Sequence, residues 1–204
     1  MTVLQVARDW ADDDPHEGDR REIEALIESE DVPELERRFA GPLTFGTAGL
    51  RGPLRAGPAG MNAAVVMRAA AGLGSWLHGA GHGGGGVVIG YDARHRSDEF
   101  AGLSAEVLTA AGFAVTVLPR PLPTPVLSFA VRHLGAVAGI MVTASHNPPQ
   151  DNGYKVYLGD GAQLVPPADA AIEAAIAVVP SVRALPRSDE WVTAGASASS
   201  TAVT

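Results

Sequence analysis

The chain of 204 residues contains no cysteine and no long apolar run. Without cysteine, a disulfide framework and a thiolate metal site are excluded; this leaves the compartment open but fits a reducing cytoplasm, which is our prediction. Nowhere do about 18 apolar residues run together, so no membrane span is expected. The N-terminus carries acidic residues in place of the apolar core of a secretory signal. We therefore expect a soluble cytoplasmic protein with no membrane partner.

Basic charge is also scarce, and it is unevenly placed. Residues 1–40 hold 13 acidic and 5 basic side chains, whereas residues 41–204 hold 10 of each, so the net charge of −8 lies entirely in the first segment. No basic stripe is available to neutralise nucleic acid phosphates, which argues against nucleic acid as a partner. The neutral remainder can still bind one anion locally.

Lysine occurs once, at Lys155, against 14 arginines. An arginine stays protonated, whereas a lysine can lower its pKa on burial and exchange a proton, so a proton carrier is the one cation that arginine cannot replace. The alternative is that Lys155 is a surface residue on a strand and that its uniqueness is accidental.

Residues 143–155, with the sequence TASHNPPQDNGYK, follow an apolar run at 137–142. Ser145 therefore stands just past a predicted strand, where the carboxyl ends of strands face the ligand crevice of an open α/β sheet. Asn147 precedes a proline, which biases the backbone of this loop to an extended form. The position suits a nucleophile.

Hydrophobic periodicity and capping residues predict alternating elements. Helices are expected at 17–30, 32–39, 62–80 with Asn62 as its cap, 98–111, 124–134 and 168–178. Strands are expected at 43–45, 87–91, 114–118 and 137–142, with a hairpin of 154–158 and 162–165 around an Asp-Gly turn. Strand–helix–strand alternation implies a three-layer α/β/α fold with a mostly parallel mixed sheet, an antiparallel edge hairpin and short N-terminal helices.

Three regions are predicted from this pattern. Residues 1–40 form an acidic helical segment, and residues 41–180 form one α/β/α domain. Residues 181–204 lose all periodicity and end in an Ala/Ser/Thr-rich stretch, so we expect a disordered low-complexity tail.

Several alternative sites fail on their context. The glycine run at 81–86 precedes a strand, whereas a dinucleotide fingerprint follows one, and no P-loop exists because Lys155 is preceded by Tyr154. The six histidines show no helical pairing for zinc. A serine hydrolase is disfavoured because G-x-S-x-G is absent around Ser145.

Four segments together resemble the phosphohexomutase superfamily of phosphoglucomutases and phosphomannomutases. They are FGTAGLRG at 45–52, GYDAR at 90–94, LPTP at 122–125 and the TASHNPPQDNGYK segment, in the order of that family. The resemblance covers most of residues 43–167 and is limited to domain I of a four-domain family. It implies that this chain lacks three C-terminal domains of the same polypeptide as its partners. These would supply the metal loop (second domain), the sugar-selecting loop (third) and the phosphate-binding loop (fourth).

The resemblance also implies roles for particular residues. Ser145 would rest as a phosphoserine, with Lys155 as proton carrier and His146 and Arg51 beside it. The phosphate-binding candidates are Thr47, Arg51, Arg94 and Asn147. Three of the named residues have open alternatives. His146 could be a loop residue whose ring stacks on Pro148, Arg51 an ordinary surface cation, and Arg94 an ion-pair partner of Asp92 or Asp98. Asp92 itself is expected to bond loop amides as an Asx turn does.

The implied reaction is phosphate exchange between Ser145 and hexose or pentose phosphates through a sugar bisphosphate. The implied cofactors are Mg²⁺ and a glucose 1,6-bisphosphate-type activator. Ser145 would contribute one oxygen to Mg²⁺ through its phosphate, and the other ligands would lie outside the chain. Which sugar phosphate reacts is left open. The alternative is a truncated, non-catalytic fragment or sugar-phosphate-binding module, and on either reading we expect the fragment alone to be inactive.

Overall fold

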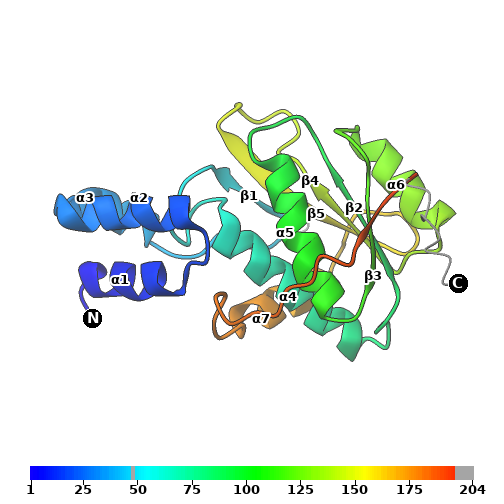
Figure 1. Cartoon of the computed structure of the whole chain (residues 1–204), viewed down its shortest axis with the longest axis horizontal. Coiled ribbons are helices and arrows are strands. Elements are labelled where there is room, and N and C mark those ends of the chain that lie inside the picture. Colours follow the sequence, from blue (N-terminus) through cyan, green and yellow to red (C-terminus); the bar gives the residue numbers. More distant parts are fainter. Residues whose placement is uncertain (47–48, 196–204) are drawn as a thin grey trace, which may run out of the picture.

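The computed structural model describes residues 1–46 and 49–195. Three helices open the chain and form a small bundle at one end of the molecule: α1 (Val3–Asp13), α2 (Glu17–Glu28) and α3 (Val32–Arg38) (Figure 1). The remaining elements are β1 (Leu50–Pro53), α4 (Ala63–Gly79), β2 (Gly86–Tyr91), α5 (Ser97–Ala110), β3 (Ala114–Val117), α6 (Thr124–His133), β4 (Ala138–Val142), β5 (Asp151–Leu158), α7 (Ala168–Ala177) and β6 (Val192–Thr193).

The strands form one mixed sheet in the order β1-β5-β4-β2-β3-β6. The pairs β2–β4, β2–β3 and β3–β6 are parallel, whereas β5 runs antiparallel to both β4 and β1. The predicted α/β class with a mostly parallel sheet and an antiparallel edge is confirmed.

Helices cover both faces of the sheet because the central strands are apolar on both sides. In β2, Val87 and Ile89 face the larger core, which α4, α5 and α7 complete, while Val88 faces a smaller core under α6. Alternate side chains of a strand point to opposite faces, so an unbroken apolar run identifies a strand buried on both sides. This arrangement leaves the strand ends as the place for polar residues.

The long helix α4 begins where the sequence predicts. Asn62 is fully buried, and its side-chain oxygen accepts a hydrogen bond from Val65 N at 3.0 Å. Its amide also donates to the carbonyls of Arg55, Gly57 and Gly60, which ties the preceding loop to the helix start. The side-chain cap satisfies an N–H group that the first turn of a helix otherwise leaves unpaired.

Two predictions at the N-terminal side are wrong. Helix α1 was not expected. Its fully buried residues are Ala7 and Ala11, and Val3, Leu4 and Trp10 pack partly buried against the same cluster. The first strand lies at β1 and not at residues 43–45. The sequence did not indicate β1 because it contains Gly52 and Pro53, residues that are rare in strands but tolerated at a sheet edge.

The predicted hairpin is shorter than expected. The chain turns back at Gly161, which has φ +77°, but the return arm makes only an isolated bridge between Tyr157 and Gln163. The antiparallel edge is instead β1, paired with β5.

The expected tail from residue 181 does not hold for residues 181–195. Val192 and Thr193 add a parallel strand to β3, and Asp13 accepts hydrogen bonds from Ser181 and Val182. A strand of two residues is too short to give a periodic pattern, so the composition of this segment suggested a tail. The rest of the predicted tail, residues 196–204, lies outside the described residues. None of the described helices is long and apolar enough to cross a membrane.

Candidate phosphate-transfer site

The candidate site lies where β4 and β2 end. Asp92 follows β2 and Thr143 follows β4, and these strands are parallel neighbours, so both residues reach the same edge of the sheet. The antiparallel β5 then brings Lys155 back beside Met141, and β1 places Arg51 opposite Gly153. Segments at 51, 92, 145 and 155 therefore converge although they are distant in sequence.

Ser145 is exposed on the loop between β4 and β5, residues 143–150, which we call the serine loop. Its backbone has φ +56°, a left-handed conformation that is uncommon for a residue other than glycine, and its N–H donates to Thr143 Oγ1 at 2.9 Å. Lys155 Nζ donates a hydrogen bond to Ser145 Oγ at 2.7 Å. Strained backbone at an exposed hydroxyl is a feature of functional sites.

The ammonium group of Lys155 is electrostatically disfavoured at this position. Partial burial lowers the pKa of Lys155 below its ordinary value, and the nearby positive charge of Arg51 lowers it further. Because both causes penalise the protonated form, more Lys155 is neutral at a given pH than for a lysine in water. The group bonded to Ser145 is thus better able to accept and return a proton.

Arg94 holds the serine loop by hydrogen bonds to its backbone. Its guanidinium donates to the carbonyl oxygens of Ser145 (2.6 Å), Asn147 (3.0 Å), Pro148 (2.9 Å) and Asp151 (3.2 Å), and Nε donates to Asp92 Oδ2 at 3.2 Å. These five bonds use all five N–H donors of an arginine. For Arg94 to contact a phosphate directly, it would have to release one of these acceptors.

Asp92 links the same loop to the sheet. Its carboxylate accepts from Thr143 Oγ1 at 2.6 Å, from Ser97 Oγ at 2.8 Å and from the backbone N–H of Arg94 at 3.1 Å. The last bond is the Asx-turn contact expected from the sequence. Asp92 is therefore fully occupied in fixing the loop.

Asn147 connects the serine loop to Arg51. Its side-chain oxygen accepts from Arg51 Nη1 at 3.2 Å, and its amide donates to Asp151 Oδ2 at 2.9 Å. Asp151 was not among the sequence candidates, although its spacing of four residues from Asn147 across a Pro-Pro turn was a readable signal. No carboxylate lies within ion-pair distance of Arg51 in the described part of the chain.

The two remaining candidates are not drawn into this network. His146 is exposed and forms no hydrogen bond or ion pair with residues 1–46 or 49–195, so it is not paired with its neighbour Ser145. Thr47 lies outside the described residues.

Close backbone packing keeps Arg51 and the serine loop together. A Cβ on Gly153 would lie 2.6 Å from the carbonyl oxygen of Thr143 and 2.8 Å from that of Leu50. Only glycine permits this approach. Beside the loop, Asp92, Arg94, His95, Asn147 and their neighbours line an open crevice of about 370 Å³, room for a small polar ligand.

The described residues do not form a complete metal site. No group of three or more His, Cys, Asp or Glu side chains is arranged to hold an ion within residues 1–46 and 49–195. Asp92 and Asp151, the carboxylates that contact side chains of the serine loop, already accept hydrogen bonds. The donor set therefore does not fit a Mg²⁺ ion held by this chain alone.

Comparison with known proteins gives a consistent result. Residues 42–181 match the sequence model of the family described as phosphoglucomutase/phosphomannomutase, alpha/beta/alpha domain I. A probable phosphomannomutase of Haemophilus influenzae is 51% identical over 138 residues, covering 65% of this chain and 28% of the relative. The phosphoribomutase of Saccharomyces cerevisiae is 41% identical over 170 residues, covering 82% of this chain and 27% of the relative.

A solved structure supports the same relationship. The fold superposes on a Thermus thermophilus protein assigned as a phosphomannomutase with a TM-score of 0.66 and 40% identity, covering 75% of this chain and 33% of that one. The chain thus spans less than a third of the length of the Haemophilus and Saccharomyces relatives.

Proposed function

Because the chain belongs to the phosphoglucomutase/phosphomannomutase family through its domain I, we propose that Ser145 is its phosphate carrier. In this role Ser145 takes a phosphoryl group from a sugar bisphosphate and passes it to a hexose or pentose monophosphate. The observation that carries the proposal is the 2.7 Å bond from Lys155 Nζ to an exposed Ser145 Oγ. The protein as a whole would act as a phosphosugar mutase.

The transfer step uses Lys155 as a proton relay. A hydroxyl oxygen of the sugar phosphate attacks the phosphorus of phosphoserine, forming a new O–P bond while the bond from phosphorus to Ser145 Oγ breaks. Neutral Lys155 accepts the hydroxyl proton and returns a proton to Ser145 Oγ, so no net charge is left on the lysine. The lowered pKa of Lys155 favours the neutral form that this relay requires.

The site supplies positive charge where the phosphate would sit. A phosphoserine carries close to two negative charges and strong acceptor oxygens. Arg51 has no carboxylate partner among the described residues and is held by Asn147, so its guanidinium can contact the phosphate. Arg94 acts indirectly by fixing the loop, Thr47 stays a phosphate-binding candidate, and His146 keeps the supporting polar role that the family resemblance implies.

Turnover is expected to need more than residues 1–204. A phosphorylated Ser145 offers one oxygen to Mg²⁺, but the described residues provide no carboxylate cluster to complete the site. We therefore expect Mg²⁺ to be held together with ligands outside this chain, and a glucose 1,6-bisphosphate-type activator to charge Ser145. The proton relay through Lys155 does not depend on a metal held by this chain.

The missing carboxylate cluster also favours a second candidate, a sugar-phosphate-binding module without turnover. Such a module would bind glucose 6-phosphate but would never acquire phosphate on Ser145. The two functions therefore differ in a single covalent bond.

The test is transfer of phosphate from glucose 1,6-bisphosphate in the presence of Mg²⁺, followed by mass spectrometry of the peptide that contains Ser145. It is run on this chain and on a longer protein in which a relative's C-terminal domains are joined to it. The proposal expects phosphate on Ser145 in the longer protein and none in its Ser145→Ala variant. Binding of glucose 6-phosphate without any label on Ser145 would support the binding module instead.

A further inference from the structure

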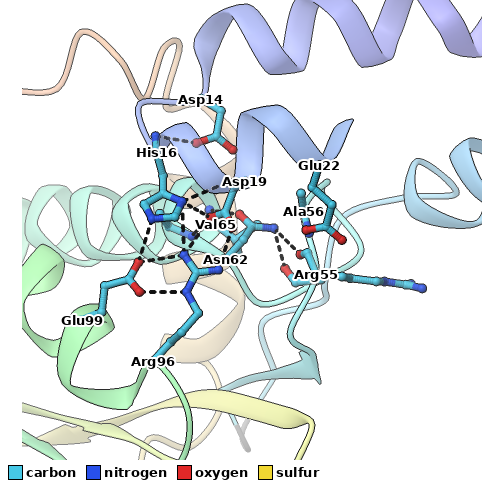
Figure 2. A network of polar contacts seen from close by, with 12 residues as sticks. Asp14, His16, Asp19, Glu22, Arg55, Ala56, Asn62, Val65, Arg96 and Glu99 are labelled. Atoms are coloured by element: carbon cyan, nitrogen blue, oxygen red, sulfur yellow. Dashed lines mark hydrogen bonds and ion pairs between the residues drawn. The ribbon is translucent and has the colours of Figure 1, made fainter. Parts of the chain in front are cut away.

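The loop that supports the serine loop is itself held by the N-terminal segment, residues 1–40. This β2–α5 loop, residues 92–96, contains two arginines with different partners. Arg94 contacts the serine loop, whereas Arg96 reaches Asp19 on α2, 77 positions earlier in the chain (Figure 2). The β2–α5 loop therefore connects the N-terminal segment to the serine loop.

The contact to α2 is a two-carboxylate clamp. Arg96 Nη1 and Nη2 bind the two oxygens of Asp19 at 2.6 and 2.9 Å, and Nε and Nη2 bind the two oxygens of Glu99 on α5 at 2.8 and 2.7 Å (Figure 2). Asp19 is only 3% exposed. A bidentate pair with one buried partner fixes geometry more firmly than a fully exposed ion pair.

The clamp extends beyond the loop. Asp19 Oδ2 also accepts from the backbone N–H of Ala63 at 3.0 Å, the first residue of α4. His16 lies beside the same group: its Nδ1 accepts from Asp19 N at 3.0 Å, and its Nε2 is 3.6 Å from Glu99 Oε1. Two helices and the β2–α5 loop are thus tied to one carboxylate.

The clamp holds Arg96 in an unfavourable backbone conformation. Arg96 has φ +61°, and as the N-cap of α5 it gives that helix no side-chain cap. A left-handed conformation at a residue other than glycine persists only when its surroundings impose it. The bonds from its side chain to Asp19 and Glu99 oppose a return of Arg96 to a relaxed backbone conformation.

From Arg96 the connection to Ser145 is short. The neighbouring His95 carbonyl accepts from Asn152 Nδ2 at 3.0 Å, and the same amide donates to Ser97 Oγ at 3.0 Å. Two residues before Arg96, Arg94 binds the Ser145 and Asn147 carbonyls. A change in the backbone at Arg96 would therefore be transmitted to Ser145 and Asn147 within the serine loop and to Asn152 just after it.

We propose that Asp19 and Arg96 are positioning residues for the phosphate-carrying serine, which makes the N-terminal segment a part of the transfer machinery. The proposal rests on the proposed function for its chemical consequence, but the structural link can be tested without any phosphate transfer. A merely structural clamp would dock α2 and leave the serine loop unchanged when it is removed.

The first measurement is amide hydrogen exchange of the whole chain, read separately for residues 1–40 and for the serine loop. Asp19→Asn keeps the size of the side chain and removes its charge. We expect exchange in the serine loop to rise by about tenfold or more, because a lost clamp lowers the local opening free energy. Arg96→Lys keeps the positive charge but loses the bidentate guanidinium, so exchange in the serine loop should rise less. This variant also tests the link if Asp19→Asn does not fold.

Arg38→Gln is the matched control. Arg38 binds Glu22 at 2.6 Å and the Ala56 carbonyl at 3.3 Å, so its loss weakens the docking of the N-terminal segment without touching the β2–α5 loop. It should raise exchange in residues 1–40 and leave the serine loop unchanged. Unchanged serine-loop exchange in both Asp19→Asn and Arg96→Lys would overturn the proposal.

The second measurement is phosphate transfer to Ser145 in the longer protein. Asp19→Asn is expected to lower the maximum rate by about 10- to 100-fold with little change in the half-saturating donor concentration, since misplacement of a reacting group affects rate more than binding. If the wild type takes up no phosphate while the serine loop still loosens in Asp19→Asn, the proposed function fails and the positioning link stands. An unchanged maximum rate in a phosphorylated Asp19→Asn protein would refute the catalytic consequence.

Discussion

Cations are used in opposite ways in the N-terminal segment and at the serine loop. In residues 1–40, four of the five arginines pair with glutamates of the same segment: Arg20 with Glu24, Arg21 with Glu17, Arg37 with Glu34, and Arg38 with Glu22 and Glu34. At the serine loop, Arg51 and Lys155 bind only neutral groups among the described residues, the Asn147 side chain and the Ser145 hydroxyl. Cations without a carboxylate partner beside an exposed hydroxyl, and not a local excess of charge, are the basis of the proposed anion site.

The largest expected effect comes from replacing the lysine of the site. Lys155→Ala in the longer protein should lower the rate of phosphate transfer by about 10² to 10⁴, the usual contribution of a positioned proton carrier. Lys155→Arg should lose nearly as much, because arginine keeps the charge but does not give up its proton. Single-turnover transfer kinetics measure both variants. A wild-type rate in Lys155→Arg would show that Lys155 acts only as a fixed positive charge and not as a proton carrier.

The second prediction concerns the repulsion between the two unpaired cations. Arg51→Gln removes a positive charge near Lys155, so the pKa of Lys155 should rise towards its ordinary value. Since Lys155 is the only lysine, a sample labelled at lysine Cε gives a single side-chain NMR signal whose titration reports this pKa. Arg21→Gln, which breaks an exposed pair in α2, is the control and should leave the signal unchanged.

The transfer rate of Arg51→Gln provides an independent check. We expect a loss of about 10- to 100-fold, because a charge-assisted contact to phosphate contributes on the order of 1.5–3 kcal/mol. A rate equal to that of Arg21→Gln would mean that Arg51 does not contact the phosphate.

The third prediction tests the close packing that brings Arg51 to the serine loop. Gly153→Ala should lower the free energy of unfolding by about 1–3 kcal/mol, since the new methyl group would meet two backbone carbonyls that cannot rotate away. Gly102→Ala in α5 is the matched control: no atom lies within 4 Å of its added Cβ, and alanine should stabilise the helix by up to about 1 kcal/mol. Urea unfolding of both variants gives the comparison, and an equal stability for the two would contradict it.

The last prediction concerns a carboxylate of the N-terminal segment, whose effect is confined to one pH window. Burial raises the pKa of Asp14 to about 6, and one of its oxygens is buried without a hydrogen-bond partner. A raised folded-state pKa means that the folded state binds more protons than the unfolded state between about pH 4 and 6, so stability falls as the pH rises through this window.

Asp14→Asn removes that cost. At pH 7 the variant should be more stable than the wild type by roughly 1–3 kcal/mol, and the gain should disappear below about pH 4. The exposed Asp12→Asn serves as control and should show no such pH dependence. Thermal unfolding at pH 4 and pH 7 decides; a stabilisation that is equal at both pH values would show that ionisation of Asp14 is not its cause.

Much of the central fold could be predicted because its residues signal their elements locally. The strands β2 and β4 are continuous apolar runs, and α4 has a capping asparagine, so their positions follow from periodicity and capping. Helix α1 was missed although Val3, Leu4 and Trp10 share its packed side with Ala7 and Ala11, and strand β6 is only two residues long. Their stability comes from tertiary contacts that a local pattern does not contain.

The site divides in the same way. Ser145 and Lys155 stand out by position and by composition, and the structure brings them together at 2.7 Å. The division of labour between Arg94 and Arg96 could not be read from GYDARHRS, because it depends on the left-handed backbone at Arg96 and on Asp19 from a distant helix. The sequence identifies which polar residues follow a strand, whereas the fold determines which groups they form hydrogen bonds with.

The most direct test of the claim that Arg51 and Lys155 are reserved for a phosphate on Ser145 is the titration of the single lysine signal with and without that phosphate. Phosphoserine can be placed at position 145 during translation, so the measurement does not depend on transfer activity. The account predicts that the pKa of Lys155, lowered in the unmodified protein, rises clearly when Ser145 is phosphorylated, because a neighbouring anion favours the ammonium form. A lysine pKa that is the same in both forms would contradict it.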